Sequence, residues 1–274
     1  MNEHWRDVFH QQHGMRDYDE VLVPRMFTPW GNILLDTVGV DSANIALDVA
    51  CGPGTVTRLL SERVGPSGRV TGADLSPAML EIARERGAPS EGGAIDWVEC
   101  PADALQVDDH IFDVIVCQQG LQFFPDKPTA LREMHRAARH GARLGIACWA
   151  PIDDSPMFAA MARALDRYLG ADAGAKYRAG PWGFTDGDEL ARVVEEAGFR
   201  DVRVERLAMP VTFEDAVAQL VTMAEFMPVA DELHALDDTQ AAELVGLIEG
   251  ELGTMLDGDS VTADTIAHIA LALA

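Results

Sequence analysis

Two short stretches of the chain combine residue types that can bind a nucleoside. Residues 47–54 read Leu-Asp-Val-Ala-Cys-Gly-Pro-Gly, and Asp74 follows the next apolar run, residues 69–73. Glycines after a buried strand let the backbone approach a ligand where a side chain at Gly52 or Gly54 would collide with it. An acidic residue about 20 positions further along is placed to accept hydrogen bonds from ribose hydroxyls. We therefore expect a ligand that contains a nucleoside.

The residues of the turn argue against a dinucleotide as this ligand. In the dinucleotide fingerprint a third glycine allows close packing of helix on strand, and the helix N-terminus faces a pyrophosphate. That third position is Thr57 when the motif is read from Gly52, and Thr55 when it is read from Ala50. Neither frame completes the fingerprint.

The turn instead resembles the first motif of class I S-adenosylmethionine (SAM)-dependent methyltransferases, an acidic residue followed by alternating small residues and glycines. Asp48 matches the acidic residue, and Gly52 and Gly54 match the glycines. Ala50 replaces the usual first glycine. We expect this replacement to be mild, because alanine adds only a methyl group and needs only ordinary backbone angles there.

A second match lies further along the chain. Residues 111–124 read Ile-Phe-Asp-Val-Ile-Val-Cys-Gln-Gln-Gly-Leu-Gln-Phe-Phe and are followed by Pro125 and Asp126. This stretch, with Pro-Ala-Asp-Ala at 101–104, resembles the small-molecule methyltransferases related to the enzymes of ubiquinone and menaquinone biosynthesis. The resemblance covers roughly residues 20–205. It implies an α/β fold, a Rossmann-like, doubly wound, mostly parallel sheet of seven strands with a helical cap.

The resemblance also implies a set of cofactor contacts. The residues expected around the methionine part of SAM are Asp48, Ala50, Gly52 and Gly54. The residues expected at the ribose hydroxyls and the adenine are Asp74, which takes the ribose, and Leu75, Met79, Ala102, Asp103 and Ala104. Gln118 is expected near the amino-acid group, and Arg25 or Trp30 is a candidate to close over that end. The competing structural explanations are loop capping for Asp48 and Asp103 and solvation of a helix start for Asp74.

The implied chemistry is methyl transfer, with S-adenosylhomocysteine as the product. The sulfonium of SAM already activates its methyl group, so catalysis needs the acceptor atom held in line at about 3 Å and shielded from water. A base helps when the acceptor is a hydroxyl. No catalytic residue can be identified; His13 is a weak candidate base among eight histidines.

The acceptor is expected to be a small, partly hydrophobic molecule, such as a quinone, a polyketide, a terpenoid or a similar natural product. The formal charge of −24 repels nucleic acid. Cys117-Gln118-Gln119-Gly120 also stands where enzymes acting on bases or amide nitrogens carry Asn/Asp-Pro-Pro-aromatic. No carboxylate cluster suggests a magnesium site, so no metal is expected. The candidates for the substrate pocket are Phe9, Tyr18, Gln119, Trp149, Met223, Phe226 and Met227. For any single aromatic or Met residue of the cap and the insert, ordinary packing on the sheet is the commoner explanation.

The elements that must position these residues follow from apolar runs and periodic stretches. Strands are expected at residues 45–49, 69–73, 95–99, 112–117, 144–149, 202–209 and 265–271. Helices are expected after 55, after Ser76, and at 128–139, 156–169, 188–197, 213–225 and 239–252, with a Gly- and Ala-rich loop at 170–183. We expect one methyltransferase domain, 1–274. Its parts are a helical cap (1–32), the SAM-binding core (33–150), the rest of the sheet and its helices (151–209), a helical insert over the substrate site (210–259) and the last strand (260–274).

The bulk properties fit a cytoplasmic enzyme. A hydrophobic content of 48% excludes a disordered chain. The N-terminus does not read as a secretory signal, and the longest apolar stretch, near 266–274, is too short to span a bilayer. The four cysteines have no paired short spacing and are expected to be small buried hydrophobes. We expect no membrane partner, and a monomer or a homodimer.

Two other functions stay open on the sequence alone. One is a nicotinamide-dependent oxidoreductase on a related sheet, which needs a pyrophosphate site that Thr57 does not favour. The other is a SAM-binding protein without transferase activity.

Overall fold

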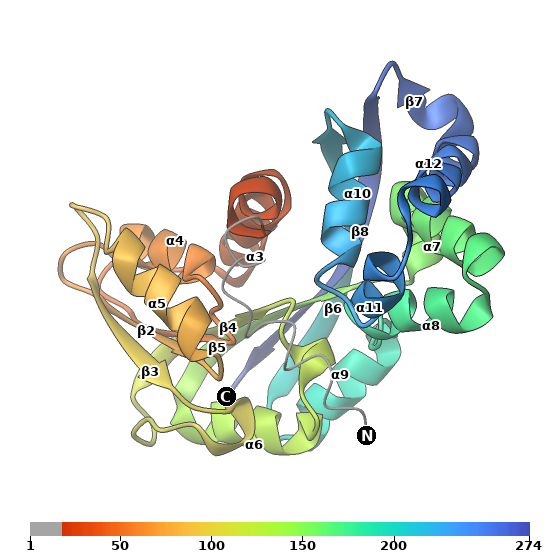
Figure 1. Ribbon diagram of the computed structural model, residues 1–274. Coiled ribbons are helices and arrows are strands. Elements are labelled where there is room, and N and C mark those ends of the chain that lie inside the picture. The colour runs from red at the N-terminus through yellow and green to blue at the C-terminus, as the bar shows by residue number, and fades with distance from the viewer. Residues whose placement is uncertain (1–17) are drawn as a thin grey trace. The chain divides into compact units, whose positions relative to one another are not determined.

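The structure is a computed structural model that describes residues 18–274 (Figure 1). Contacts between Cα atoms divide the chain into two compact units. We call one the sheet unit; it comprises Phe27–Cys148, Phe184–Leu207 and Ala267–Ala274. We call the other the helical unit; it comprises the described residues up to Met26, Trp149–Gly183 and Ala208–Ile266.

The strands follow the order of a doubly wound α/β sheet. Among the described residues the order is β3-β2-β1-β4-β5-β8-β6, and the short β7 pairs with β8 off this path. The pairs β3·β2, β2·β1, β1·β4 and β4·β5 are parallel. The strands are β1 (Ile45–Val49), β2 (Arg69–Asp74), β3 (Ala94–Glu99), β4 (Phe112–Gln118), β5 (Ala138–Trp149), β6 (Arg200–Phe213), β7 (Leu256–Asp257) and β8 (Ser260–Leu273). The predicted fold class is confirmed, and the tail is a strand as expected.

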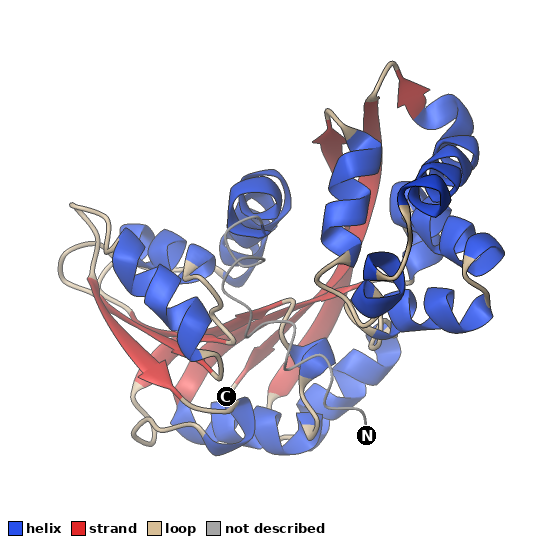
Figure 2. Cartoon of the chain, in the orientation of Figure 1, coloured by secondary structure: helices blue, strands red, loops and turns tan. Residues whose placement is uncertain are grey.

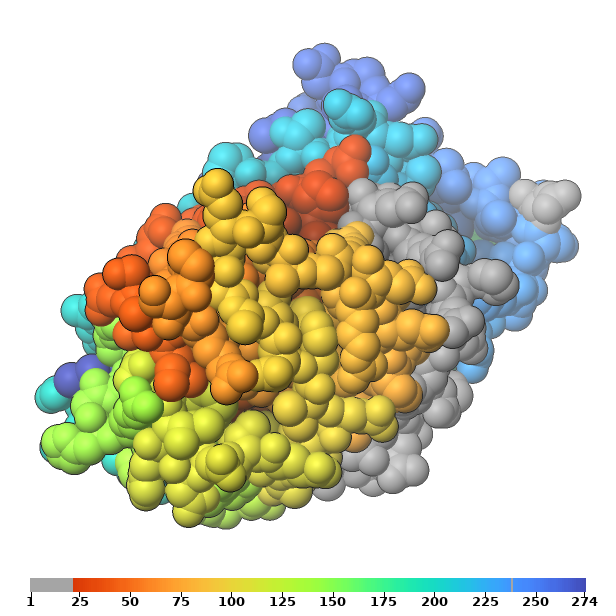
Figure 3. Space-filling model, turned by 90° about the vertical axis from the view of Figure 1, so that its left-hand side faces the viewer, coloured from red at the N-terminus to blue at the C-terminus, as the bar shows by residue number. Residues whose placement is uncertain are grey.

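The central strands are apolar along their length, as parallel strands covered on both faces must be. β1 and β4 are almost entirely buried, whereas β3 at the end of the sheet is partly exposed along its length. In the space-filling view, the orange and yellow surface includes this edge and the helix α5 (Pro77–Arg86) (Figure 3). The strand order reverses between β1 and β4, and ligands of open α/β sheets bind at such a switch point, outside the carboxyl ends of the strands.

Several helices of the sheet unit, which is drawn with its helices in blue in Figure 2, begin at a side-chain cap. The side chain of Ser76 accepts the backbone N–H of Met79, and Pro77 occupies the first turn, as the sequence predicts. Asp126 caps the helix before β5 in the same way. The helices and 3-10 turns of the sheet unit are α3 (Thr28–Val38), α4 (Thr55–Val64), α5 (Pro77–Arg86), η2 (Ala102–Ala104), η3 (Leu121–Phe123), α6 (Lys127–Ala137) and α9 (Gly187–Glu196).

The helical unit is built mainly from helices around an aromatic core. Phe158 lies 5.3 Å from Trp182 and 6.2 Å from Phe213, measured between ring centroids, and Tyr177 lies 5.5 Å from Trp182. The elements of this unit, besides the strand segments, are η1 (Tyr18–Phe27, a π-helix that ends at the first residue of the sheet unit), η4 (Ile152–Asp154), α7 (Pro156–Tyr168), α8 (Ala171–Ala179), α10 (Ala216–Ala224), α11 (Ala230–His234), α12 (Asp238–Leu252) and η5 (Gly253–Met255).

Several predicted boundaries were wrong. The expected loop at 170–183 contains α8, because its alanines favour helix and Gly174 lets the helix approach α7: a Cβ at Gly174 would lie 1.8 Å from Oδ1 of Asp166. α11 was not expected. β5 begins at Ala138 rather than at 144, because an irregular register lets Ala138 pair with Phe112 before the regular ladder starts.

The four cysteines are all buried and form no disulfide within residues 18–274. Burial raises the pKa of the thiols of Cys51, Cys117 and Cys148. The expectation of small buried hydrophobes is confirmed. None of the described helices has the length and the apolar composition needed to cross a membrane.

The buried hydroxyl of Tyr177 predicts a stabilising substitution. It has no hydrogen-bond partner among the described residues, and an unpaired buried hydroxyl costs about 1 to 3 kcal/mol. We expect Tyr177→Phe to raise the free energy of unfolding by about 1 kcal/mol in chemical denaturation. The control is Tyr168→Phe, which removes an exposed hydroxyl that donates to Glu243 and should change the value by less than about 0.5 kcal/mol. A clear loss of stability in Tyr177→Phe would contradict the structure.

Candidate cofactor site

The glycine turn lies at the switch point of the sheet. Asp48 in β1 pairs with Gly72 in β2 and with Val116 in β4, so it is central in the sheet. The backbone N–H of Cys51 donates to the carbonyl of Ala73 at 3.0 Å, which extends the pairing of β1 and β2 beyond the last residue of β1. The turn that follows therefore lies beside the carboxyl end of β2.

The carboxylate of Asp74 joins this turn to the start of the next helix. Its Oδ2 accepts the backbone N–H of Gly52 at 2.7 Å, and its Oδ1 accepts the backbone N–H of Ser76 at 2.8 Å. Asp74 therefore does have the role at a helix start that was the alternative to ribose binding. A carboxylate accepts several hydrogen bonds at once, so this role is compatible with binding hydroxyls.

The two glycines of the turn are required for different reasons. Gly52 has φ +53°, and no described atom lies within 4 Å of the position of a Cβ there. Gly54 has φ +77°, but a Cβ there would lie 2.4 Å from Cη2 of Trp97. The expectation that a side chain at Gly54 would collide with the ligand is corrected: it would collide with Trp97. Only Gly52 leaves space.

Ala50 does not have the ordinary backbone angles expected from the sequence. Its φ is +57°, in the left-handed region, where an L-residue other than glycine costs about 1 to 2 kcal/mol. Its methyl group lies beside Gly120, since a Cβ at Gly120 would be 2.7 Å from Cβ of Ala50. The replacement of the first glycine therefore carries strain, and Gly120 makes room for it.

The side chain of Asp48 is buried at the turn and is held by Thr57, which was not among the predicted site residues. The hydroxyl of Thr57 donates to Oδ2 of Asp48 at 2.7 Å, and both side chains are buried. Burial raises the pKa of Asp48 to about 7; the Thr57 hydrogen bond lowers it, and the charge of Asp74 adds to the rise. Thr57, which disqualified the dinucleotide fingerprint, thus has a function in this turn: it is the hydrogen-bond donor to Asp48.

Two buried polar atoms beside the turn lack partners from residues 18–274, namely Oγ1 of Thr55 and Oε1 of Gln118. Thr55 begins α4, next to Gly54, which cannot cap the helix with a side chain. Nε2 of Gln118 donates to the carbonyl of Phe27 at 2.9 Å, which fixes Oε1 as the remaining acceptor. Gly31 makes room for this amide, since a Cβ there would be 2.9 Å from Oε1.

The residues expected to contact the adenine come after strands β2 and β3. Leu75 is 39% exposed directly after Asp74, and Met79 is buried on α5. The segment 102–104 is η2, just beyond β3. The loop that follows η2 is fixed to α6, because the backbone N–H of Leu105 donates to Glu133 at 3.0 Å and Arg136 donates to the carbonyl of Leu105 at 3.0 Å.

The sheet unit brings most predicted cofactor residues to one edge, but it does not hold all of them. Trp30 belongs to this unit and is fully buried on α3, whereas Arg25 belongs to the helical unit. The predicted substrate residues are divided in the same way. Gln119 lies in the sheet unit, and those in the helical unit are Trp149, Met223, Phe226 and Met227. Tyr18 begins η1, and Phe9 and His13 lie outside the described residues.

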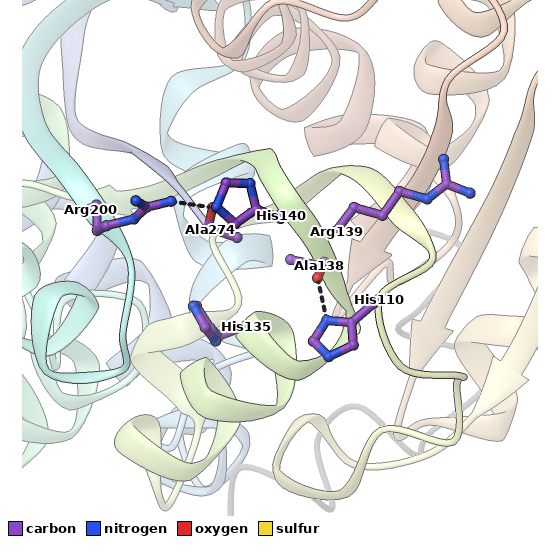
Figure 4. Close-up of a pocket in the computed structure, with 7 residues that line it drawn as sticks. All are labelled: His110, His135, Ala138, Arg139, His140, Arg200 and Ala274. Atoms are coloured by element: carbon purple, nitrogen blue, oxygen red, sulfur yellow. Dashed lines mark hydrogen bonds between the residues drawn. The ribbon is translucent and has the colours of Figure 1, made fainter.

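A separate pocket of about 260 Å³ lies at the amino ends of β4 and β5, the edge opposite to the turn (Figure 4). Three of its basic residues already have partners. Nδ1 of His110 lies 3.0 Å from the carbonyl oxygen of Ala138, Arg139 pairs with Asp113 at 2.6 Å, and Arg200 donates to the carbonyl of Ala274 at 3.0 Å. The lining residues are His110, His135, Ala138, Arg139, His140, Arg200 and Ala274. These histidines are therefore far from the turn along the strands.

The sequence pattern of the ubiE/COQ5 methyltransferase family matches residues 2–169, more than half of the chain. The chain belongs to the ubiE/COQ5 methyltransferase family. It is 34% identical over 186 residues to a demethylmenaquinone methyltransferase of Staphylococcus aureus, covering 64% of this chain and 76% of that protein. The family resemblance inferred from the sequence is confirmed.

Solved structures of methyltransferases share the fold. A putative methyltransferase of Bacillus halodurans has a TM-score of 0.57 at 17% identity, covering 89% of this chain and 97% of that one. Phosphoethanolamine N-methyltransferase 2 of Haemonchus contortus, solved with SAM, has a TM-score of 0.64 at 15% identity, covering 98% of this chain and 59% of that one. As a ubiE/COQ5-family member, the protein is a SAM-dependent methyltransferase acting on a small molecule. The nicotinamide-dependent alternative is not favoured.

The raised pKa of Asp48 predicts a pH dependence that Asp48→Asn should lack. The carboxyl titrates at 3.8 in its ordinary environment and at about 7 in the folded chain. Between these values the folded state holds the proton more tightly, so the free energy of unfolding of the wild type falls as pH rises and levels off above the window. The variant cannot titrate there. The free energy of unfolding of the variant minus that of the wild type, measured in urea denaturation, should therefore rise by on the order of 3 kcal/mol between about pH 4 and pH 7.5. Parallel pH profiles would show that Asp48 has no raised pKa.

Proposed function

We propose that this ubiE/COQ5-family enzyme transfers the methyl group of SAM to a hydroxylated ring compound of the quinol class, partly hydrophobic and of small size. The support for the acceptor is the 34% identity to a protein whose name specifies demethylmenaquinone as its substrate. The support for the cofactor site is the geometry of the turn and of Asp74. A role in acceptor binding for Trp149, Met223, Phe226 and Met227 stays a prediction.

On this proposal Asp74 holds the ribose. Its carboxylate is fixed by two backbone N–H groups, so its orientation is set before any ligand arrives. A fixed acceptor for the hydroxyls lowers the cost of ordering on binding. Leu75 and Met79 pack on one side of the adenine and η2, with Asp103, lies along its edge.

The methionine end of SAM fits the polar atoms that lack partners in the described chain. The Thr55 hydroxyl at the N-terminus of α4 suits the carboxylate, since helix N-termini favour anions. Oε1 of Gln118 is an acceptor that suits the ammonium group. The positive charge of bound SAM near Asp48 would favour the ionised form of the Asp48 carboxyl. The ribose hydroxyls, the carboxylate and the ammonium group of the cofactor therefore each have a complementary atom at this edge.

When bound, SAM supplies a methyl group that its sulfonium already activates. The residues of the chain then bind, orient and exclude water, which is work of proximity and desolvation. No histidine of the described residues is assigned as a base, and a role for His13 stays a prediction.

The proposal depends most on the open space beside Gly52, and a matched pair of variants tests it. Gly52 and Gly258 have similar positive φ, +53° and +62°, and at each no described atom lies within 4 Å of a Cβ position. Gly52→Ala and Gly258→Ala should therefore each lose about 1 kcal/mol of stability. Only Gly52→Ala should bind S-adenosylhomocysteine at least tenfold more weakly in calorimetry, because its methyl group enters the cofactor space. Equal affinities of the two variants would mean that the turn is merely structural.

A further inference from the structure

The segment directly after β4 has a strained residue that is not glycine. Gln119 has φ +54°, and its side chain is only 6% exposed. Its backbone N–H still donates to the carbonyl of Ala147 at 2.9 Å, so the position is fixed by the sheet. Strained non-glycine residues persist where the surroundings enforce them, and they cluster at functional sites.

Gln119 forms a buried pair with Gln122 of η3. Nε2 of Gln122 donates to Oε1 of Gln119 at 3.1 Å, and Gln122 is only 7% exposed. The other two amide atoms, Nε2 of Gln119 and Oε1 of Gln122, find no partner in the part of the chain that the structure describes. A buried amide pair with half of its atoms unpaired destabilises the fold unless a ligand completes it.

The chemistry of this pair does not depend on how the amides are oriented. Amide oxygen and nitrogen atoms are assigned from hydrogen bonding, so both amides could be turned over together. In either arrangement one amide N–H group and one amide carbonyl are left over. The pair therefore always offers one donor and one acceptor.

The pair lies at the edge of the sheet where the cofactor turn lies. Gln119 follows Gln118, whose unpaired Oε1 is one of the polar atoms beside the turn, and it precedes Gly120, which contacts the methyl group of Ala50. β4 is the strand next to β1 on the far side from Asp74. The sheet unit thus has a second group of unpaired polar atoms next to the cofactor turn, separate from Asp74.

We propose that Gln119 and Gln122 bind the methyl acceptor, and that they select a ring that carries a free hydroxyl. The amide N–H donates to the oxygen of this hydroxyl, and the amide carbonyl accepts its hydrogen. Amides do not titrate near neutral pH, so the pair orients the acceptor and does not remove its proton. This inference rests on the proposed function and adds to it the polar pattern of the acceptor.

The test measures binding of two probe molecules to the full chain saturated with S-adenosylhomocysteine. 2,3-Dihydroxynaphthalene can donate and accept on one edge, whereas 2,3-dimethoxynaphthalene can only accept. The wild type should bind the diol more tightly than the dimethoxy compound, by about three- to tenfold for the hydrogen bond that only the diol can make. Gln122→Met keeps the size of the side chain and removes its amide; it should abolish this preference. Gln106→Met, at an exposed position outside the pair, is the control and should retain it.

Two further readouts separate the possible failures. Affinity for S-adenosylhomocysteine should be the same within twofold in the wild type and in Gln122→Met. Unfolding of the variant should stay cooperative, and its denaturation midpoint should fall only modestly, because the unpaired Oε1 of Gln122 is removed while Oε1 of Gln119 loses its donor. A tenfold loss of S-adenosylhomocysteine affinity in the variant would mean that the pair contacts the cofactor, and would overturn the proposal. Normal cofactor binding with no preference for the diol in the wild type, or with the preference unchanged in Gln122→Met, would also overturn it. No binding of S-adenosylhomocysteine to the wild type would instead refute the proposed function.

Discussion

The hydrogen bond from the backbone N–H of Gly52 to the carboxylate of Asp74, at 2.7 Å, is the interaction on which the site depends. It joins two residues 22 positions apart, at the ends of neighbouring parallel strands. The sheet register brings the strand ends together, and the left-handed angles at Ala50, Gly52 and Gly54 turn the chain so that this N–H faces the carboxylate. One bond therefore fixes both the turn and the carboxylate before a ligand binds.

The unpaired buried polar atoms of the sheet unit gather at this edge. They belong to Thr55, Gln118, Gln119 and Gln122, and they have no partner among the described residues. Asp48, a buried carboxyl with a raised pKa, lies there too. Left-handed backbone does not by itself indicate this edge, because Ala43, His110 and Asp201 have positive φ at the amino ends of strands. Unpaired buried atoms persist where binding offsets their cost, so they indicate the functional edge.

The sequence predicted what local spacing determines, and it failed where distant segments meet. The order of strands, the glycine turn and Asp74 could be predicted because each depends on short apolar runs and on the motif. The strain at Ala50 could not, because it depends on how the turn fits against Gly120. The reason for Gly54 depends on Trp97, and the role of Thr57 depends on a buried hydrogen bond to Asp48. Likewise α8 reads as a loop from its glycines and alanines, but Gly174 allows it to pack on α7.

The most direct test of the central claim is a crystal structure of the protein with S-adenosylhomocysteine. We expect electron density for one adenosine whose ribose hydroxyls lie within hydrogen-bonding distance of the Asp74 carboxylate, with the homocysteine part passing over Gly52. Adenosine bound elsewhere, or Gly52 and Asp74 contacting different ligands, would contradict it.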